Sequence, residues 1–161
     1  MQLTSFALAA AALTPLIAAP AAAPVSCQTS SGGGVGTWST PEYHGGVGQF
    51  QAVVTLRGAA PAQYTFSGVL IENDFGPIAC LSCLSGELIG TLDDGVGPGP
   101  DYYIEGGYFG DWLRGTGSFS GVIRDTPFPV SAPVGFVQGR FAEQPAFASQ
   151  GVLLAALEIC D

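Results

Sequence analysis

Apolar and polar residues alternate along most of the chain after residue 45, with the period of two that is typical of a half-buried β-strand. The alternation is clearest over residues 46–57, where Phe50 and Val54 fall on one side and Gln49 and Thr55 on the other. The same pattern predicts strands over residues 63–72, 86–92, 101–109, 116–124 and 134–143. Residues 149–160 are apolar on both sides, which predicts a strand buried on two faces, with a short helix as the alternative.

Phenylalanine and glycine lie two positions apart on the apolar side of several predicted strands. The pairs are Gly48 and Phe50, Phe66 and Gly68, Phe119 and Gly121, and Gly139 and Phe141. Glycine inside a strand marks a sharp bend or a close approach to the backbone, and alternating small and large interior residues fill small barrels. The sequence therefore predicts one all-β domain, an antiparallel up-and-down β-barrel of about seven or eight strands, with a β-sandwich as the alternative.

Aromatic residues occur on both sides of the strand predicted over residues 101–109. Tyr102, Tyr108 and Trp112 fall on one side, and Tyr103 and Phe109 on the other. An exposed apolar patch often marks a ligand groove or an interface. We therefore take Tyr102, Tyr103, Tyr108 and Trp112 as candidate ligand-binding residues, the alternative being that both faces are covered.

The N-terminus resembles a secretory signal peptide, because an apolar run is followed by small residues. Residues 1–21 are predicted to be removed after Ala21, residues 22–45 to form a flexible arm, and residues 46–161 to form the β-domain. The run is interrupted by Pro15 and Pro20 and is too short for a membrane anchor, and lipidation at Cys27 is the minor alternative. We expect a bacterial protein of the periplasm or the extracellular medium.

Charge limits the partners of the chain. It has 161 residues with 13 acidic side chains and four arginines, for a formal net charge of −9. Binding to nucleic acid depends on cations that neutralise phosphates, so we expect no nucleic-acid partner and no attraction to an anionic membrane. No later stretch is long enough to span a bilayer as a helix, and we expect the protein not to be an integral membrane protein.

Four cysteines in an exported chain favour disulfides, with three possible pairings. We favour Cys27 with Cys160, which would join the two ends of the mature chain, and Cys80 with Cys83. A redox role for the Cys80 and Cys83 pair needs a helix N-terminus that lowers a thiol pKa, and no helix signal follows. A zinc site of four thiolates conflicts with an oxidising compartment.

Acidic residues gather around a loop rich in glycine and proline. Asp93, Asp94 and Asp101 supply the oxygen ligands that calcium prefers. The sequence predicts calcium as the possible metal there and no other cofactor, and the alternative is a solvated acidic turn.

Together these observations favour an exported, non-enzymatic β-domain that binds a small ligand or a protein partner. The first alternative is a structural protein of the envelope or the extracellular space, with a calcium-stabilised acidic loop. The second is a small hydrolase centred on His44, the only histidine, or on the carboxylates between Asp93 and Asp111.

Overall fold

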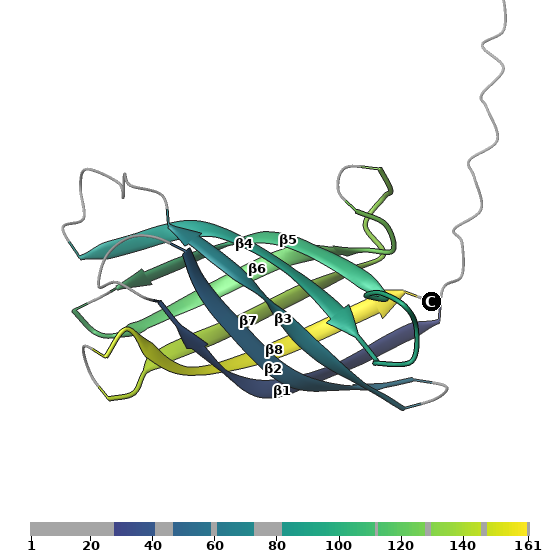
Figure 1. Ribbon diagram of the computed structural model, residues 1–161, viewed down its shortest axis with the longest axis horizontal. Helices are drawn as coiled ribbons and strands as arrows, with labels where there is room; N and C mark the ends of the chain where they lie inside the picture. Colours follow the sequence, from purple (N-terminus) through teal and green to yellow (C-terminus); the bar gives the residue numbers. More distant parts are fainter. Residues whose placement is uncertain are drawn as a thin grey trace, which may run out of the picture.

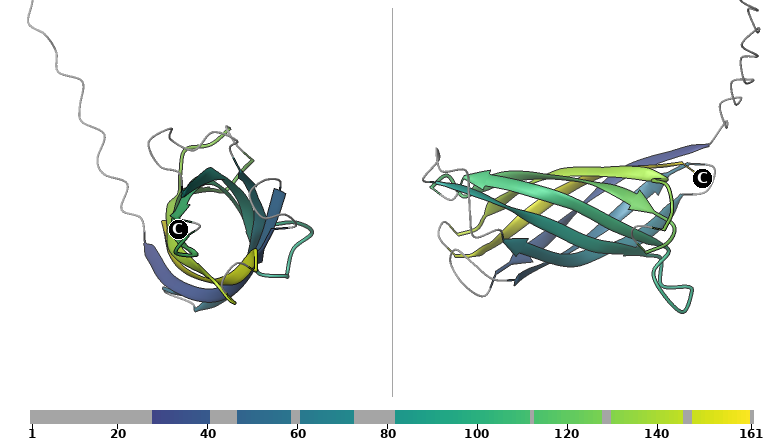
Figure 2. Two further views of the ribbon diagram at one scale, coloured as in Figure 1. Left: turned by 90° about the vertical axis from the view of Figure 1, so that its left-hand side faces the viewer. Right: turned by 90° about the horizontal axis from the view of Figure 1, so that it is seen from above.

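The computed structural model describes residues 28–40, 47–58, 61–72, 82–111, 113–127, 130–145 and 148–160 of the chain. The strands are β1 (Thr29–Ser39), β2 (Val47–Arg57), β3 (Ala62–Glu72), β4 (Cys83–Asp93), β5 (Tyr102–Asp111), β6 (Thr116–Arg124), β7 (Gly135–Glu143) and β8 (Gln150–Cys160). Each strand pairs with the next in antiparallel fashion, and β8 pairs with β1, so that the sheet closes into an eight-stranded barrel (Figures 1 and 2). The predicted up-and-down barrel is confirmed.

The two ends of the barrel carry different connections. β1 begins and β8 finishes at the end that we call the terminal end, together with the connections β2–β3, β4–β5 and β6–β7 (right in Figure 1). The other connections leave from the opposite end, which we call the far end. Within the described part of the chain, no helix is long and apolar enough to cross a membrane.

One predicted boundary is wrong. Residues 29–39, expected within a flexible arm, form β1, which pairs along its length with both β2 and β8. The glycines at 32, 33, 34 and 36 hide this strand from a hydrophobicity pattern. A Cβ atom added to Gly34 or Gly36 would lie 1.9 or 2.1 Å from a backbone oxygen of β2, so the close approach of the two strands requires glycine there.

The last strand also differs in part from its prediction. β8 is a strand, as preferred, but it is buried on one face only, with alternating buried and outward-facing positions. Leu153 and Leu157 are buried inside the barrel, whereas Leu154 points outward and is 57% exposed. Apolar residues on both sides of a strand therefore did not indicate burial on both sides.

The core lies inside the barrel and is entirely apolar at its centre. Its buried side chains are Phe50, Ala52, Val54, Leu56, Phe66, Leu88, Leu92, Ile104, Phe119, Ile123, Val137, Leu153, Ala155, Leu157 and Ile159. Phe66 lies between two other rings, with centroids 4.7 Å from Phe50 and 6.3 Å from Phe119. These contacts join strands that are far apart in the sequence.

Inward glycines make room for the aromatic rings. Phe119 lies opposite Gly139 on the neighbouring strand, and a Cβ on Gly139 would lie 2.2 Å from its Cζ. Phe50 likewise lies opposite Gly68, where a Cβ would lie 2.8 Å from the ring. The spacing of glycine and aromatic residues in the sequence thus reflects a ring that packs over the backbone of the adjacent strand.

Candidate functional site

The interior of the barrel has almost no free space. Near the far end, side chains that include Trp38, Leu88 and Phe141 line a cavity of about 20 Å³. This is about the space that one water molecule requires. A ligand inside the barrel would need an open apolar mouth, so the filled interior directs the search to the outer surface.

The tyrosines predicted to bind a ligand do not share one face. Tyr102 and Tyr108 point inward and pack against the core. Tyr102 contacts Tyr64 edge to face near the terminal end, with ring centroids 6.1 Å apart, and Tyr108 contacts Phe141 near the far end at 6.3 Å. Tyr103 points outward, and Trp112 lies outside the described residues. Of the four candidates, Tyr103 alone is shown on the outer surface.

The hydroxyl of Tyr108 has a clearly displaced pKa. Burial and, to a smaller extent, the negative charge of Glu72 raise the pKa of Tyr108 from 10.0 to about 12. Both effects favour the neutral phenol at any physiological pH. Tyr108 is therefore a packed interior side chain whose phenol stays protonated.

A groove on the outer surface contains Tyr103. It crosses β3, β4 and β5 and has a volume of about 460 Å³, within the range of small-molecule sites. Its lining is mainly apolar, and Pro127, from the connection between β6 and β7, forms part of its wall. The remaining lining residues are Ser67, Gly68, Val69, Ile89, Gly90, Thr91, Tyr103, Ile104, Glu105 and Arg124. We call this the outer groove.

The strand register explains why these side chains meet. Val69 lies opposite Ile89, and Ile89 lies opposite Glu105, so two apolar side chains and one carboxylate form a row across β3, β4 and β5. A second row follows two residues along the strands, where Ser67 lies opposite Thr91 and Thr91 opposite Tyr103. Outward side chains at these distances form a continuous surface.

The carboxylate of Glu105 has an unusual environment for an outward-facing side chain. Its Oε2 atom is buried and has no hydrogen-bond partner among the described residues. Across the strands it lies between Ile89 and Val122, whose side chains cannot donate a hydrogen bond. Buried polar atoms in folded proteins nearly always have a partner, so this oxygen is an acceptor available to a donor from outside the described residues.

The wall formed by the connection between β6 and β7 is held by polar contacts. Arg124 donates a hydrogen bond from Nη1 to the carbonyl of Ser131, across the connection. The backbone N–H of Val134 donates to the carbonyl of Ile123 at 2.8 Å, which closes the base of the connection. These bonds keep Pro127 beside the strands, and the groove is therefore a built feature of the fold.

The three predicted calcium ligands come together at the terminal end. The nearest ligand atoms of Asp93, Asp94 and Asp101 lie within 4.8 Å of one another. Each carboxylate also accepts a backbone N–H of the same loop, at 2.7 to 2.8 Å. These hydrogen bonds explain the cluster, because carboxylates that accept nearby backbone N–H groups stabilise a turn. Calcium binding stays a prediction.

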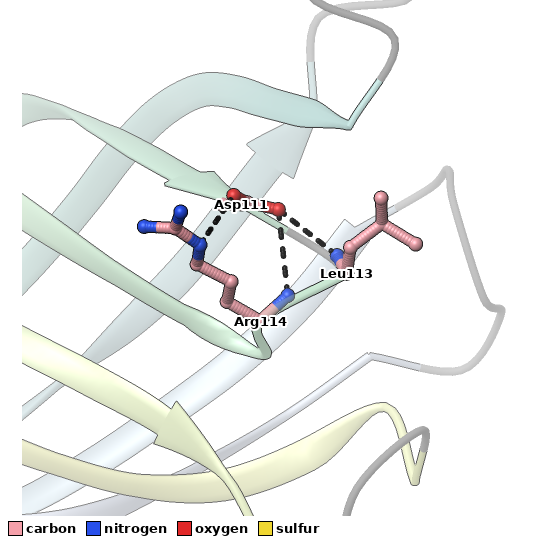
Figure 3. Close-up of polar contacts among 3 residues, drawn as sticks. All are labelled: Asp111, Leu113 and Arg114. Carbon is pink, nitrogen blue, oxygen red and sulfur yellow. Dashed lines mark hydrogen bonds and ion pairs between the residues drawn. The ribbon is translucent and has the colours of Figure 1, made fainter.

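At the far end, Asp111 shapes the turn after β5 (Figure 3). Its Oδ1 accepts the backbone N–H of Leu113 at 3.1 Å, and its Oδ2 lies 3.4 Å from Nε of Arg114. The Arg114 side chain is 81% exposed, so this ion pair contributes little stability. Asp111 thus has a structural task, like the carboxylates of the acidic turn.

The remaining predicted site residues are described only in part. Cys83 and Cys160 are each disulfide-bonded, while Cys27, Cys80 and His44 lie outside the described residues. The pairing of the cysteines, and any role of His44, therefore stay predictions.

Sequence reasoning missed most of the outer groove. Val69, Ile89 and Glu105 belong to three strands, and only the register places them in one row. The signal in the sequence was the apolar residue on the nominally polar side of a strand, such as Ile89. Comparison of the chain with protein-family models, with curated proteins and with solved structures gave no match.

Proposed function

We propose that this chain is an exported, non-enzymatic β-barrel domain that binds a small, mainly apolar ligand in the outer groove. The observation that carries the proposal is the groove itself, about 460 Å³ of mainly apolar surface with a few polar groups. Ligand sites in proteins typically combine these two properties. The filled interior supports a site on the outside of the barrel.

The distribution of polar residues supports a barrel that is surrounded by water. The inward side chains are apolar, whereas the outward face of β2 exposes Gln49, Gln51, Thr55 and Arg57 together with Val47 and Val53. Barrels that span a membrane carry a continuous apolar outer band, which these polar side chains would interrupt. We therefore propose that the protein is not embedded in a bilayer.

Export is supported by the cysteines. Cys83 and Cys160 are disulfide-bonded, and disulfides persist mainly in oxidising compartments such as the periplasm or the extracellular medium. This agrees with the signal peptide predicted over residues 1–21, and we propose the periplasm or secretion as the location.

A non-enzymatic role is supported by the tasks of the carboxylates. Asp93, Asp94, Asp101 and Asp111 each accept backbone N–H groups within a turn. A hydrolase centred on these side chains would need a carboxylate positioned over a substrate cleft, whereas these lie in or directly beside the turns at the two ends of the barrel.

The proposal is tested by titration with the neutral, apolar fluorophore N-phenyl-1-naphthylamine. Thr91→Trp, which fills the outer groove, is expected to weaken binding by about 10-fold or more, the effect of losing most of the buried contact area. Thr55→Trp places the same side chain on the exposed outer face of β2, outside the groove, and should leave binding unchanged. Equal affinities of wild type and Thr91→Trp would contradict the proposal.

A further inference from the structure

The polar feature that distinguishes the outer groove is Glu105. It is the single acidic residue among the lining side chains, and its Oε2 atom is buried without a hydrogen-bond partner among the described residues. An ionised carboxylate accepts hydrogen bonds and cannot donate them. The chemical group that would complement it is therefore a donor, and a positively charged donor makes the stronger bond.

The surroundings of Glu105 favour a donor on a small ligand. In register it lies between the aliphatic side chains of Ile89 and Val122, and the groove beside it continues over Val69 and Pro127. A ligand that covers this apolar surface removes water from the carboxylate and strengthens the interaction with a charged donor. The net charge of −9 also attracts cations to the protein as a whole.

We propose that the ligand of the outer groove is an amphiphilic amine, with a protonated nitrogen that donates to Glu105 Oε2 and a flat apolar body that packs on Val69 and Ile89. This inference rests on the proposed function, because it names the ligand class of the same groove. An ammonium group has three donors and no acceptor, which matches the acceptor atom Glu105 Oε2, without a partner among the described residues.

Three indoles with the same ring and different ends test the ligand class. Tryptamine carries an amine, tryptophol an alcohol and 3-indolepropionic acid a carboxylate. Wild-type protein is expected to bind tryptamine about 10-fold or more tightly than tryptophol, as a charge-assisted hydrogen bond implies, and to bind 3-indolepropionic acid most weakly. Calorimetric titration gives the three affinities, and backbone NMR shifts place each ligand on β3, β4 and β5.

Two matched variants attribute the preference to one carboxylate. Glu105→Gln keeps the shape of the side chain, and it should reduce tryptamine affinity to that of tryptophol while leaving tryptophol unchanged. Glu87→Gln makes the same change on the outer face of β4, at an exposed position outside the groove, and should leave both affinities unchanged. Thermal unfolding of both variants checks that the barrel is intact.

The possible failures are distinguishable. If tryptamine and tryptophol bind equally and Thr91→Trp abolishes both, the groove binds apolar ligands and the amine class is wrong. If Glu105→Gln leaves tryptamine affinity unchanged, an ordered water satisfies the carboxylate and the inference is overturned. If neither the indoles nor N-phenyl-1-naphthylamine binds, both the proposed function and the inference of an amine ligand are wrong.

Discussion

At the scale of single residues, the barrel interior depends on glycines that carry no side chain where an aromatic ring packs. Gly139 is the clearest example, because a Cβ there would lie 2.2 Å from both Phe119 Cζ and the carbonyl oxygen of Leu154. The ring could rotate away, but the backbone oxygen belongs to a neighbouring strand and cannot move without disturbing the sheet. The glycine is therefore a requirement of packing, although glycine inside a strand is otherwise unfavourable.

Gly139→Ala is expected to lower the free energy of unfolding by about 3 kcal/mol, the upper range for overpacked cores. Gly107→Ala is the matched control on β5, since Gly107 is exposed and the nearest atom to its added Cβ is 3.3 Å away. Its effect should stay within about 1 kcal/mol. Urea unfolding measures both, and similar losses in the two variants would contradict the packing explanation.

Individual residues also show the limit of sequence analysis. The alternation of Phe119 with glycine predicted an inward ring, because a strand repeats every two residues whatever surrounds it. The buried oxygen of Glu105 had no such signal. Strand register places Glu105 between Ile89 of one neighbouring strand and Val122 of the other. The local sequence around Glu105 does not identify these neighbours.

At the scale of elements, the connection between β4 and β5 was predicted from the sequence as a turn with acidic residues, and the structure has a turn there. Residues 93–100 were predicted as a turn with acidic residues around it, and three backbone N–H groups donate to the carboxylates of Asp93, Asp94 and Asp101. The three aspartates repel one another at 4.8 Å or less, so either the surrounding water or a cation must offset their charge.

A calcium ion at this turn is expected to raise the Tm by a few degrees in about 10 mM CaCl₂, as follows for a Kd of about 1 mM. Asp101→Asn should abolish the shift. Asp125→Asn removes the same charge from the exposed connection after β6 and should preserve it. Differential scanning calorimetry measures the shift, with MgCl₂ as the ionic-strength control, and an unchanged Tm in wild type would eliminate the calcium prediction.

At the scale of the whole molecule, closure of the barrel depends on the pairing of its first and last strands. Thr29 lies opposite Cys160, and the pairing continues to Ser39 opposite Gln150. Cys160 is at the terminal end, opposite Thr29, and Thr29 follows Cys27 closely in the sequence. Cys83, in contrast, begins β4 at the far end. This arrangement supports the pairing of Cys160 with Cys27, and not of Cys160 with Cys80.

The two predicted disulfides should contribute unequally. In the chain-entropy model a bridge from Cys27 to Cys160 contributes about 5 kcal/mol and a bridge from Cys80 to Cys83 about 2 kcal/mol, because the first closes a far longer loop. The double variants Cys27→Ser/Cys160→Ser and Cys80→Ser/Cys83→Ser compare the two losses by urea unfolding. A peptide linking Cys27 to Cys83, found by mass spectrometry without reduction, would contradict the pairing.

The sequence by itself determined the class of fold, the faces of most strands and the places of the turns, because a two-residue period and turn chemistry are local properties. It did not reveal β1, whose glycines carry no pattern, and it could not assemble the outer groove. That groove exists only because register aligns Val69, Ile89 and Glu105 and because the β6–β7 connection places Pro127 beside them. Contacts between distant segments of the chain decide such a surface, and only the tertiary structure contains them.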